Sequence, residues 1–548
     1  MMKLALTYQN ALDHNSSSRA FEEAFALLKQ AESRPVEDLK PASRPFRTYL
    51  YEPGENELDP AKNMSTFGAY MIKHIYSNLV RLLPDGSVIP DVAHSWEILE
   101  GGTRYIFNLR KDVLWSDGKT VTAHDFVFAV HRILDFSTRS QGASILFVIK
   151  NAEQYHRGEI EDAAFMGIRA LDEYTLEMEL KEPAAYFMQL LAHCTFSPVP
   201  AHKVEELGEQ WANPDKIVTN GPFLIQEWKH GKHIHLKKNS SYSGRFTGNL
   251  ENVEIGVDPD EDLLKSYRED RLDFLELFFA SAGTSERGKR LYPAELTSRY
   301  GLMTAFLNLN SSLSPLDDVK VRQAIVQSVD WENSHGGLAE SGLIPTGGLI
   351  PPGLPGHTPD LRLPYDPVQA RKLLEEAGYS SKNKFPKLKG TYYTGPHVRI
   401  DQWCTAFSDQ LLEILGIEID WEIDGFYDYI NQGEKKFREN HFIFWGWQVD
   451  YPDPDSMLRS NPWFEHVGDS LSPEFVSLVN QAAQISDPLE RLRLYQRADR
   501  ILIGEHYVIP AIYAMAPALV KPWVKKAPMQ LGLILVDLYD VVMEGEPE

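Results

Sequence analysis

Short strand patterns alternate with capped helices from about residue 47 to the end of the chain, and this alternation limits the fold more than any other feature. "TRYIFNLRKDVLW" alternates polar and apolar residues as a half-buried strand does, and "TAHDFVFAVHRIL" follows with helical spacing from an N-cap at Thr122. "EYTLEMELKEP" predicts another strand, while "DPVQARKLLEEAGY" and "IDQWCTAFSDQLLEILG" predict helices closed by Gly378 and Gly416. Interleaved elements of this kind predict α/β lobes.

The length of the chain divides it into domains. A chain of 548 residues is too long for one hydrophobic core, so two or three domains are expected. Residues 1–44 look separate, because Ser18 can cap a helix with an apolar face that Pro35 and Pro41 then end. We expect a small helical extension there, either a docking arm or half of a helical-repeat module.

Charge and cysteine content exclude several classes of partner. The net charge of −23 and the lack of a basic stripe argue against nucleic acid, which is bound mainly through clustered Lys and Arg. Cys194 and Cys404 are the only cysteines and lie far apart in the sequence, so they form neither a disulfide framework nor a metal-ligand motif.

The amino terminus "MMKLALTYQN" has too short an apolar run for a secretory signal, and no run reaches the length of a membrane span. We therefore expect either that the chain stays inside the cell or that its export signal lies outside this numbering.

Two stretches resemble cofactor or metal motifs but fit them poorly. In "GTSERGKR", residues 283–290, Arg290 stands where a phosphate-binding loop needs Ser or Thr. In "HGKHIH", His233 and His235 share one face of a predicted strand, with His230 before them, but the nearby lysines would repel a metal ion. We interpret the second stretch as a solvated hairpin. No catalytic constellation is evident, and we expect no cofactor and no metal.

The stretch "FIFWGWQVDYPDPDSML", residues 442–458, predicts a buried strand that ends at a site. Its apolar run stops at Gly446, and Trp447 and three acids between prolines follow. In "YPDPD" we expect Asp455 or Ser456 to cap the next helix and Asp453 to face solvent. Asp450 then remains as the acid available to a ligand.

Several stretches together resemble one family, the bacterial solute-binding proteins of family 5 that serve peptide importers. They recur in this order: "HIYSNLVRLLPDGSVIPDVAHSWEI", "YIFNLRKDVLWSDGKTVTAHDFVFAVHRIL", "FSPVPAHKVEELGEQW", "IVTNGPFLIQEW", "LNLNSSLSPLDDVKVRQAIVQSVD", "YDPVQARKLLEEAGY", "WQVDYPDPDSML" and "ALVKPWV". The resemblance runs from about residue 45 to the end of the chain and covers nothing of residues 1–44.

The resemblance implies a two-lobed α/β fold of the periplasmic-binding-protein type (type II, cluster C), with an extra subdomain inserted in lobe I. Lobe I would comprise residues 45–76, 199–300 and 518–548, the inserted subdomain residues 77–198, and lobe II residues 301–517. Such proteins close over an extended peptide and deliver it to the membrane permease of an ABC importer. The resemblance therefore implies a monomeric receptor on the outer face of the cytoplasmic membrane or in the periplasm, and no enzyme.

The resemblance also implies which residues hold the peptide. Gly446, Trp447 and Gln448 would pair with the peptide backbone from one lobe, and Met64, Ser65 and Thr66 would approach it from the other. Asp450 would bind the amino terminus of the peptide through charge-assisted hydrogen bonds. Trp447 would line a side-chain pocket, and Trp403 and Trp445 are either further pocket walls or core residues.

One position departs from the family pattern. Phe444 stands where the family has an Arg that serves the carboxyl end of the peptide. Arg399 or His397 would have to take over that role. The length of the peptide and the contact to its carboxylate stay open.

Other functions remain as alternatives. An intracellular sensor that reuses the fold is a second hypothesis, motivated by the helical extension and the short apolar run at the amino terminus. A receptor for a nickel chelate, an opine or an oligosaccharide is another. A carbohydrate-active enzyme that uses Trp stacking and an acid pair is a third, and it would require catalysis that the resemblance does not imply.

Overall fold

The computed structural model describes most of the chain between residues 40 and 544. The described residues are 40–52, 54, 57–63, 65–83, 86–278, 280–331, 342–343, 347–380, 383–394, 400–425, 428–429, 432–467, 470–485, 487–529 and 535–544. The expected helical extension falls almost wholly outside them. The chain divides into two compact units: unit 1 is Met1–Leu275, Ser486–Pro488 and Leu519–Glu548, and unit 2 is Glu276–Ile485 and Leu489–Ala518.

Unit 1 contains two four-stranded sheets. The first has the order β1-β10-β9-β8, with β1 parallel to β10 and the other pairs antiparallel. The second has the order β4-β5-β7-β6 and is antiparallel throughout. Their bounds are β1 Phe46–Tyr49, β8 Phe223–Lys229, β9 His233–Lys238, β10 Asn252–Gly256, β4 Ala93–Leu99, β5 Arg104–Leu109, β6 Ile168–Asp172 and β7 Thr175–Glu179. The second sheet lies within the range expected for an inserted subdomain.

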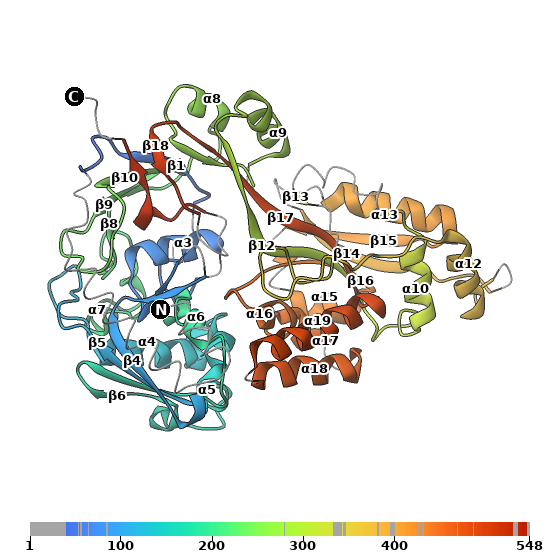
Figure 1. Ribbon diagram of the computed structural model, residues 1–548, viewed down its shortest axis with the longest axis horizontal. Coiled ribbons are helices and arrows are strands. Elements are labelled where there is room, and N and C mark those ends of the chain that lie inside the picture. Colours follow the sequence, from blue (N-terminus) through green and yellow to red (C-terminus); the bar gives the residue numbers. More distant parts are fainter. Residues whose placement is uncertain are drawn as a thin grey trace. The chain divides into compact units, whose positions relative to one another are not determined.

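The helices of unit 1 are short, and several begin where the sequence predicts (Figure 1). Helix α4 starts after Thr122, whose backbone N–H donates to the Asp125 carboxylate in a capping box. Strand β5 buries every second residue, as its alternating sequence predicts. The helices are α3 Thr66–Ile75, α4 Ala123–Leu134, α5 Ala152–His156, α6 Phe187–Leu190, α7 Ala201–Leu207 and α8 Leu263–Arg268; the short strands are β2 Val80–Leu82, β3 Val88–Pro90, β18 Val524–Lys526 and β19 Val542–Met543.

A buried polar network ties the last segment of unit 1 to its first helix. The backbone N–H of Leu538 donates to His74 Nε2 at 3.1 Å, and Arg81 pairs with Asp540 at 2.8 Å. The ion-pair partners of Asp537 lower the pKa of that carboxyl well below its usual range. Segments far apart in the sequence therefore complete one core.

Unit 2 is built on a seven-stranded sheet with the order β11-β17-β12-β16-β14-β15, and β13 pairs with β17. The strands are β11 Phe274–Glu276, β12 Leu296–Leu309, β13 Gly342–Leu343, β14 Leu388–Thr394, β15 Ile419–Gly425, β16 Phe442–Gln448 and β17 Val508–Val520. The helices are α9 Ala282–Leu291, α10 Val319–Gln327, α12 Pro367–Glu376, α13 Ile400–Leu415, α15 Gly433–Glu439, α16 Pro454–Leu458, α17 Pro462–Val467, α18 Pro473–Gln484 and α19 Pro488–Gly504. The stretch "GTSERGKR" lies inside α9 and forms no loop.

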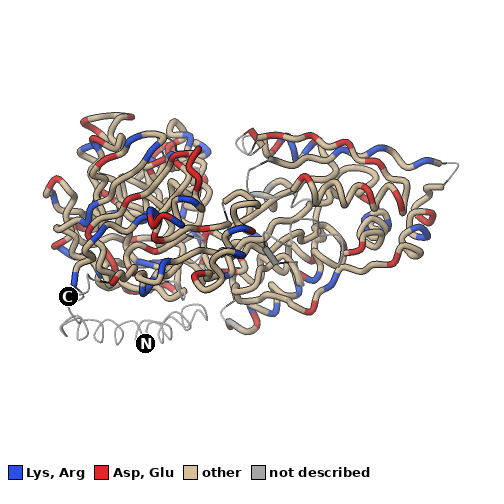
Figure 2. The backbone as a smooth tube through the Cα atoms, turned by 90° about the horizontal axis from the view of Figure 1, so that it is seen from above, with Lys and Arg blue, Asp and Glu red and all other residues tan. Residues whose placement is uncertain are grey.

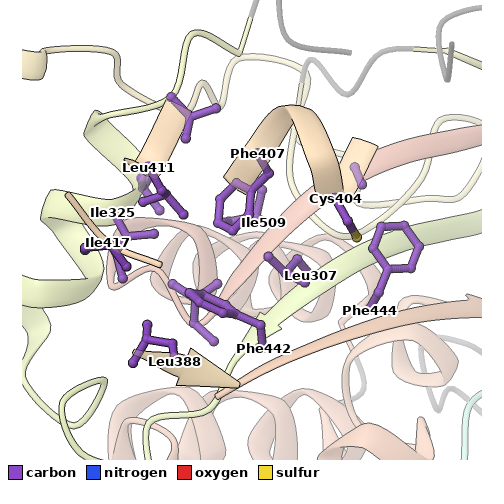
Figure 3. Close-up of a cluster of buried hydrophobic side chains, with 14 of the residues drawn as sticks. Leu307, Ile325, Leu388, Cys404, Phe407, Leu411, Ile417, Phe442, Phe444 and Ile509 are labelled. Carbon is purple, nitrogen blue, oxygen red and sulfur yellow. The ribbon is translucent and has the colours of Figure 1, made fainter. Parts of the chain in front are cut away.

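The core of unit 2 lies between the sheet and α13. Phe442 and Phe444 of β16 meet Cys404, Phe407 and Leu411 of α13 in one buried cluster (Figure 3). The apolar stripe that predicts α13 from the sequence is the face that enters this cluster. Strand β16 is thereby held rigidly along its first half.

The boundary between the units lies earlier in the chain than the boundary expected near residue 300. Strand β11 begins at Phe274 and already pairs with β17 in the unit 2 sheet. Because β12 pairs along its length with β16, the segment that leads into it also belongs to unit 2.

The charged residues of each unit are mixed in sign. Figure 2 shows Lys and Arg interspersed with Asp and Glu along both units, without a continuous basic stripe. Among the described residues, no helix combines the length and the apolar character needed to cross a bilayer.

Candidate functional site

The second half of strand β16 is the candidate site. Its residues pair with β12 in antiparallel register, Gly446 with Ala305 and Trp447 with Thr304. On the other side, the described pairing with β14 comprises Gly390 with Phe442 and Thr391 with Ile443. Beyond Ile443, the described part of this side carries no further strand pairing. A strand edge of this kind can accept an extended peptide as an added strand.

The side chains of β16 alternate between two environments. Phe442 and Phe444 enter the core against α13, whereas Trp445 and Trp447 point to the opposite face. Trp445 is 6% exposed and lies 5.5 Å from the Phe437 ring of α15, measured between ring centroids. Trp445 therefore occupies a buried position, the second of the two roles considered for it.

Trp447 is half-buried and has a fixed indole. Its Nε1–H donates to the backbone carbonyl of Ser456 in α16 at 2.9 Å. The same residue holds the loop that follows, because the backbone N–H of Asp450 donates to Ser456 Oγ at 2.9 Å. Ser456 is fully buried, so both contacts fix the strand end and Asp450 relative to α16.

Asp450 is a half-buried acid at the end of this loop. Burial raises the pKa of its carboxyl to about 7, with no cation of the protein offsetting that cost. A bound cation would favour the ionised form, since an opposite charge lowers the pKa of a neighbouring acid. The loop can therefore receive a positively charged group.

Asp453 corrects an expectation, because it does not face solvent. Its side chain caps α16 by accepting from the backbone N–H of Asp455 at 2.9 Å, a role that we had assigned to Asp455 or Ser456. It also accepts two hydrogen bonds from Arg491 of α19, at 2.7 and 2.8 Å. The expectation was wrong because Arg491 lies far along the chain, and a local turn pattern gives no sign of it.

Asp455 is fully buried and surrounded by donors. Arg459 donates twice to it, and the hydroxyls of Tyr451 and Tyr495 donate at 2.8 and 2.7 Å. Arg459 and these hydrogen bonds outweigh burial and lower the pKa of Asp455 to about 2. Asp453 and Asp455 therefore act inside unit 2, where they fix the turn that carries Asp450.

Ser65 and Thr66 begin helix α3 of unit 1. Ser65 Oγ accepts from the backbone N–H of Gly68 at 3.0 Å and donates to Glu57 at 2.5 Å. The Ser65 hydroxyl is thus occupied as an N-cap, and this segment would offer a ligand mainly backbone groups. Met64, the third member of the predicted segment, lies outside the described residues.

Trp403 lies in the core of unit 2 and not beside the β16 edge. It is 2% exposed, stacks on Phe407 with 5.5 Å between ring centroids, and meets Phe444 edge-on at 5.6 Å. This is the core role that the sequence left open. His397 and Arg399 lie outside the described residues.

Phe444 is fully buried, and its position explains why an apolar residue fits there. Its ring packs against Trp403, and its backbone carbonyl accepts from the Tyr429 hydroxyl at 2.8 Å. An arginine at this point would have to leave the core to reach a ligand. Within the described residues, the contact for a ligand carboxylate is therefore not supplied from this position.

The comparisons with known proteins place the chain in a family. A model of the bacterial extracellular solute-binding proteins, family 5 (middle part), matches residues 87–462. The probable deoxycholate-binding periplasmic protein YgiS of Escherichia coli is 30% identical over 488 residues, covering 86% of this chain and 88% of that protein. The periplasmic oligopeptide-binding protein OppA of the same organism is 29% identical over 495 residues, covering 85% and 87%.

The solved structure of OppA from Burkholderia pseudomallei matches with a TM-score of 0.74 at 26% identity and covers 93% of this chain and all of that one. The fold is thus the two-lobed α/β fold of periplasmic binding proteins. The chain belongs to the bacterial extracellular solute-binding proteins of family 5, whose members are solute-binding receptors.

Proposed function

We propose that this protein is the substrate-binding receptor of an ABC importer and that it captures extended oligopeptides. The observation that carries the proposal is the second half of β16, a rigid strand end with an edge beyond Ile443 and a half-buried acid directly after it. Similarity to OppA supports the same ligand class. The protein acts by binding and release, and the permease subunits of the importer are its partners.

The strand edge and Asp450 recognise what all peptides share. Backbone N–H and C=O groups of the ligand pair with residues Gly446–Gln448, which gives affinity without reading side chains. The ammonium at the amino end of the peptide meets Asp450 and fixes the register. Each charge-assisted hydrogen bond contributes about 1.5 to 3 kcal/mol. The predicted contacts from Met64, Ser65 and Thr66 would add to these from unit 1.

The raised pKa of Asp450 fits this role. In the free protein the ionised carboxylate is poorly solvated, and an incoming ammonium replaces the lost hydration with an ion pair. The network of Asp453, Asp455 and Arg491 holds the turn in place before the peptide arrives. Less ordering is then needed on binding, which favours affinity.

The first test is calorimetric titration of ligand-stripped protein with tri- to pentapeptides, with the same peptides acetylated at the amino end, and with deoxycholate as a third arm. The proposal predicts saturable binding of the free peptides and much weaker binding of the acetylated ones. Mass spectrometry of the recovered ligand should show the peptide intact. Binding of deoxycholate with no response to any peptide would contradict the proposal.

A further inference from the structure

The first sheet of unit 1 carries a cluster of metal-ligating side chains that is unrelated to strand β16. Glu227 of β8 lies beside His233 and His235 of β9, and their ligand atoms all lie within 4.8 Å of one another. Glu227 Oε2 is 3.3 Å from His233 Nε2 and 3.5 Å from His235 Nδ1. The two imidazole rings are stacked, with centroids 4.3 Å apart and planes 17° from parallel.

A register shift in the sheet brings the three residues together. The β8–β9 ladder pairs Ile225 with Leu236 and then Glu227 with His235, so Gln226 is an extra residue on β8. This bulge moves Glu227 onto the face of His235. His233 lies two residues away on the same face, while Ile234 and Leu236 between them are buried on the other.

The separations match those of a tetrahedral zinc site. Zinc binds imidazole nitrogens and carboxylate oxygens at about 2.0 to 2.2 Å, which places neighbouring ligands of a tetrahedron about 3.3 to 3.5 Å apart. The two measured carboxylate-to-imidazole separations, 3.3 and 3.5 Å, fall in this range. All three side chains are at least partly exposed, so small rotations bring the imidazoles to the same spacing.

The surrounding charges are mixed. Lys229 is paired with His233 across the ladder and Lys237 follows two residues after His235, and both are exposed to solvent that screens them. Glu254 of β10 is paired with His235 from the other side and adds negative charge on the same face. Sequence analysis weighed the lysines but not Glu227 and Glu254, whose positions depend on pairing between strands.

His230 is not part of the cluster. Its Nδ1 lies 2.9 Å from Glu52 Oε1, which also accepts from Trp228 Nε1 at 2.7 Å. The third imidazole of "HGKHIH" thus has a different partner. It therefore offers a matched control within the same hairpin.

We propose that Glu227, His233 and His235 bind one divalent transition-metal ion of the zinc class, with a fourth position left to water or an exchangeable ligand. Imidazole and carboxylate are the ligands that such ions prefer, and three protein ligands with one open position form a recognised zinc arrangement. The site belongs to unit 1 alone. It does not depend on the function proposed for β16.

The test is calorimetric titration of the chelator-treated full-length protein with zinc chloride at pH 7.5. We expect saturable binding of one ion per chain. His233→Ala and His235→Ala should each weaken binding at least tenfold, and Glu227→Gln less severely. His230→Ala should bind as the parent does. Lowering the pH to 5.5 should abolish binding, because the imidazoles must be neutral to ligate.

The variants change partly exposed side chains, so circular dichroism should confirm that each one folds. Absence of zinc binding by the parent would overturn the proposal. Full affinity in both histidine variants would do the same, since the ion would then bind elsewhere. A stoichiometry of one ion per two chains, with dimers on gel filtration, would also contradict a site formed within one chain.

Discussion

Asp450 and Asp455 lie in the same turn and differ in every physical respect that matters. Asp455 is fully buried with an arginine and two tyrosine hydroxyls around it, and its pKa is lowered to about 2. Asp450 is half-buried, and burial alone raises its pKa to about 7. The comparison shows how one turn holds an acid satisfied by the protein beside an acid that a ligand must satisfy.

Removing the charge of Asp455 should have the largest effect on this comparison. Asp455→Asn leaves Arg459 and two tyrosine hydroxyls without their acceptor, and breaking a buried pair in this way costs about 3 to 5 kcal/mol. Urea unfolding should show this loss for unit 2. The exposed pair of Asp360 and Arg500 gives the control, and Asp360→Asn should cost about 0.5 kcal/mol or less.

The contribution of Asp455 also has a defined pH range. Its folded pKa is lowered below that of the unfolded chain, so its stabilisation is present above about pH 4 and is lost as the pH falls towards 2. Asp455→Asn should lack this acid transition. An unfolding free energy within 1 kcal/mol of the parent at pH 7 would show that the network does not fix the turn.

The pH dependence of peptide binding should follow Asp450. Only the ionised carboxylate pairs with an ammonium, and with a free-protein pKa of about 7 the ionised fraction falls steeply below neutrality. Between pH 7.5 and 5.5 the affinity for a free-amino peptide should fall roughly fifteenfold, after allowing for the peptide amine. Calorimetry across this range measures the change. An affinity that stays constant, or that rises at low pH, would separate binding from the state of Asp450.

Asp450→Asn should stabilise the free protein. A folded pKa above the unfolded value means that the folded state binds the proton more tightly, so the parent loses stability as the pH rises from about 4 to 7. The neutral amide avoids this loss, and a gain on the order of 1 kcal/mol is expected at pH 8 for a half-buried group. At pH 4 the two proteins should unfold alike. A variant that is less stable at pH 8 would show that the carboxylate is already satisfied.

The smallest effect is expected at Ser456. Ser456→Ala removes the acceptor of the Asp450 backbone N–H, at a cost of about 0.5 to 1.5 kcal/mol in stability. Peptide affinity should fall by a factor of a few, because the Asp450 loop is held less firmly. Ser328→Ala removes a buried hydroxyl at the end of α10 and should leave affinity unchanged. Equal affinities for both variants and the parent would mean that this hydrogen bond does not position Asp450.

Local patterns in the sequence predicted the elements but not their partners. The apolar spacing of residues 400–415 and the cap at Thr122 are sufficient to define α13 and α4, because helix periodicity and capping act within a few residues. The ionic partner of Asp453 is on α19, and its role was therefore predicted wrongly. The grouping of Glu227 with His235 depends on a bulge, which alternation in either strand alone does not reveal.

The family resemblance, carried by motifs spread over most of the chain, is confirmed by the matched family model and the relatives. The structure places Gly446, Trp447, Gln448 and Asp450 together around the end of β16, with Trp403 in the core behind it. Ligand contacts of these residues stay predictions. A sequence without its ligand cannot show them, because binding energy depends on groups that only the complex brings together.

The most direct test of the account is a cycle that combines Asp450→Asn with acetylation of the peptide, measured by calorimetry at pH 7.5. If Asp450 binds the ammonium, each change alone weakens binding tenfold or more and the two together weaken it little further. The coupling free energy is then about 1.4 kcal/mol or larger. Fully additive losses, or an unchanged affinity of Asp450→Asn for the free peptide, would contradict the account.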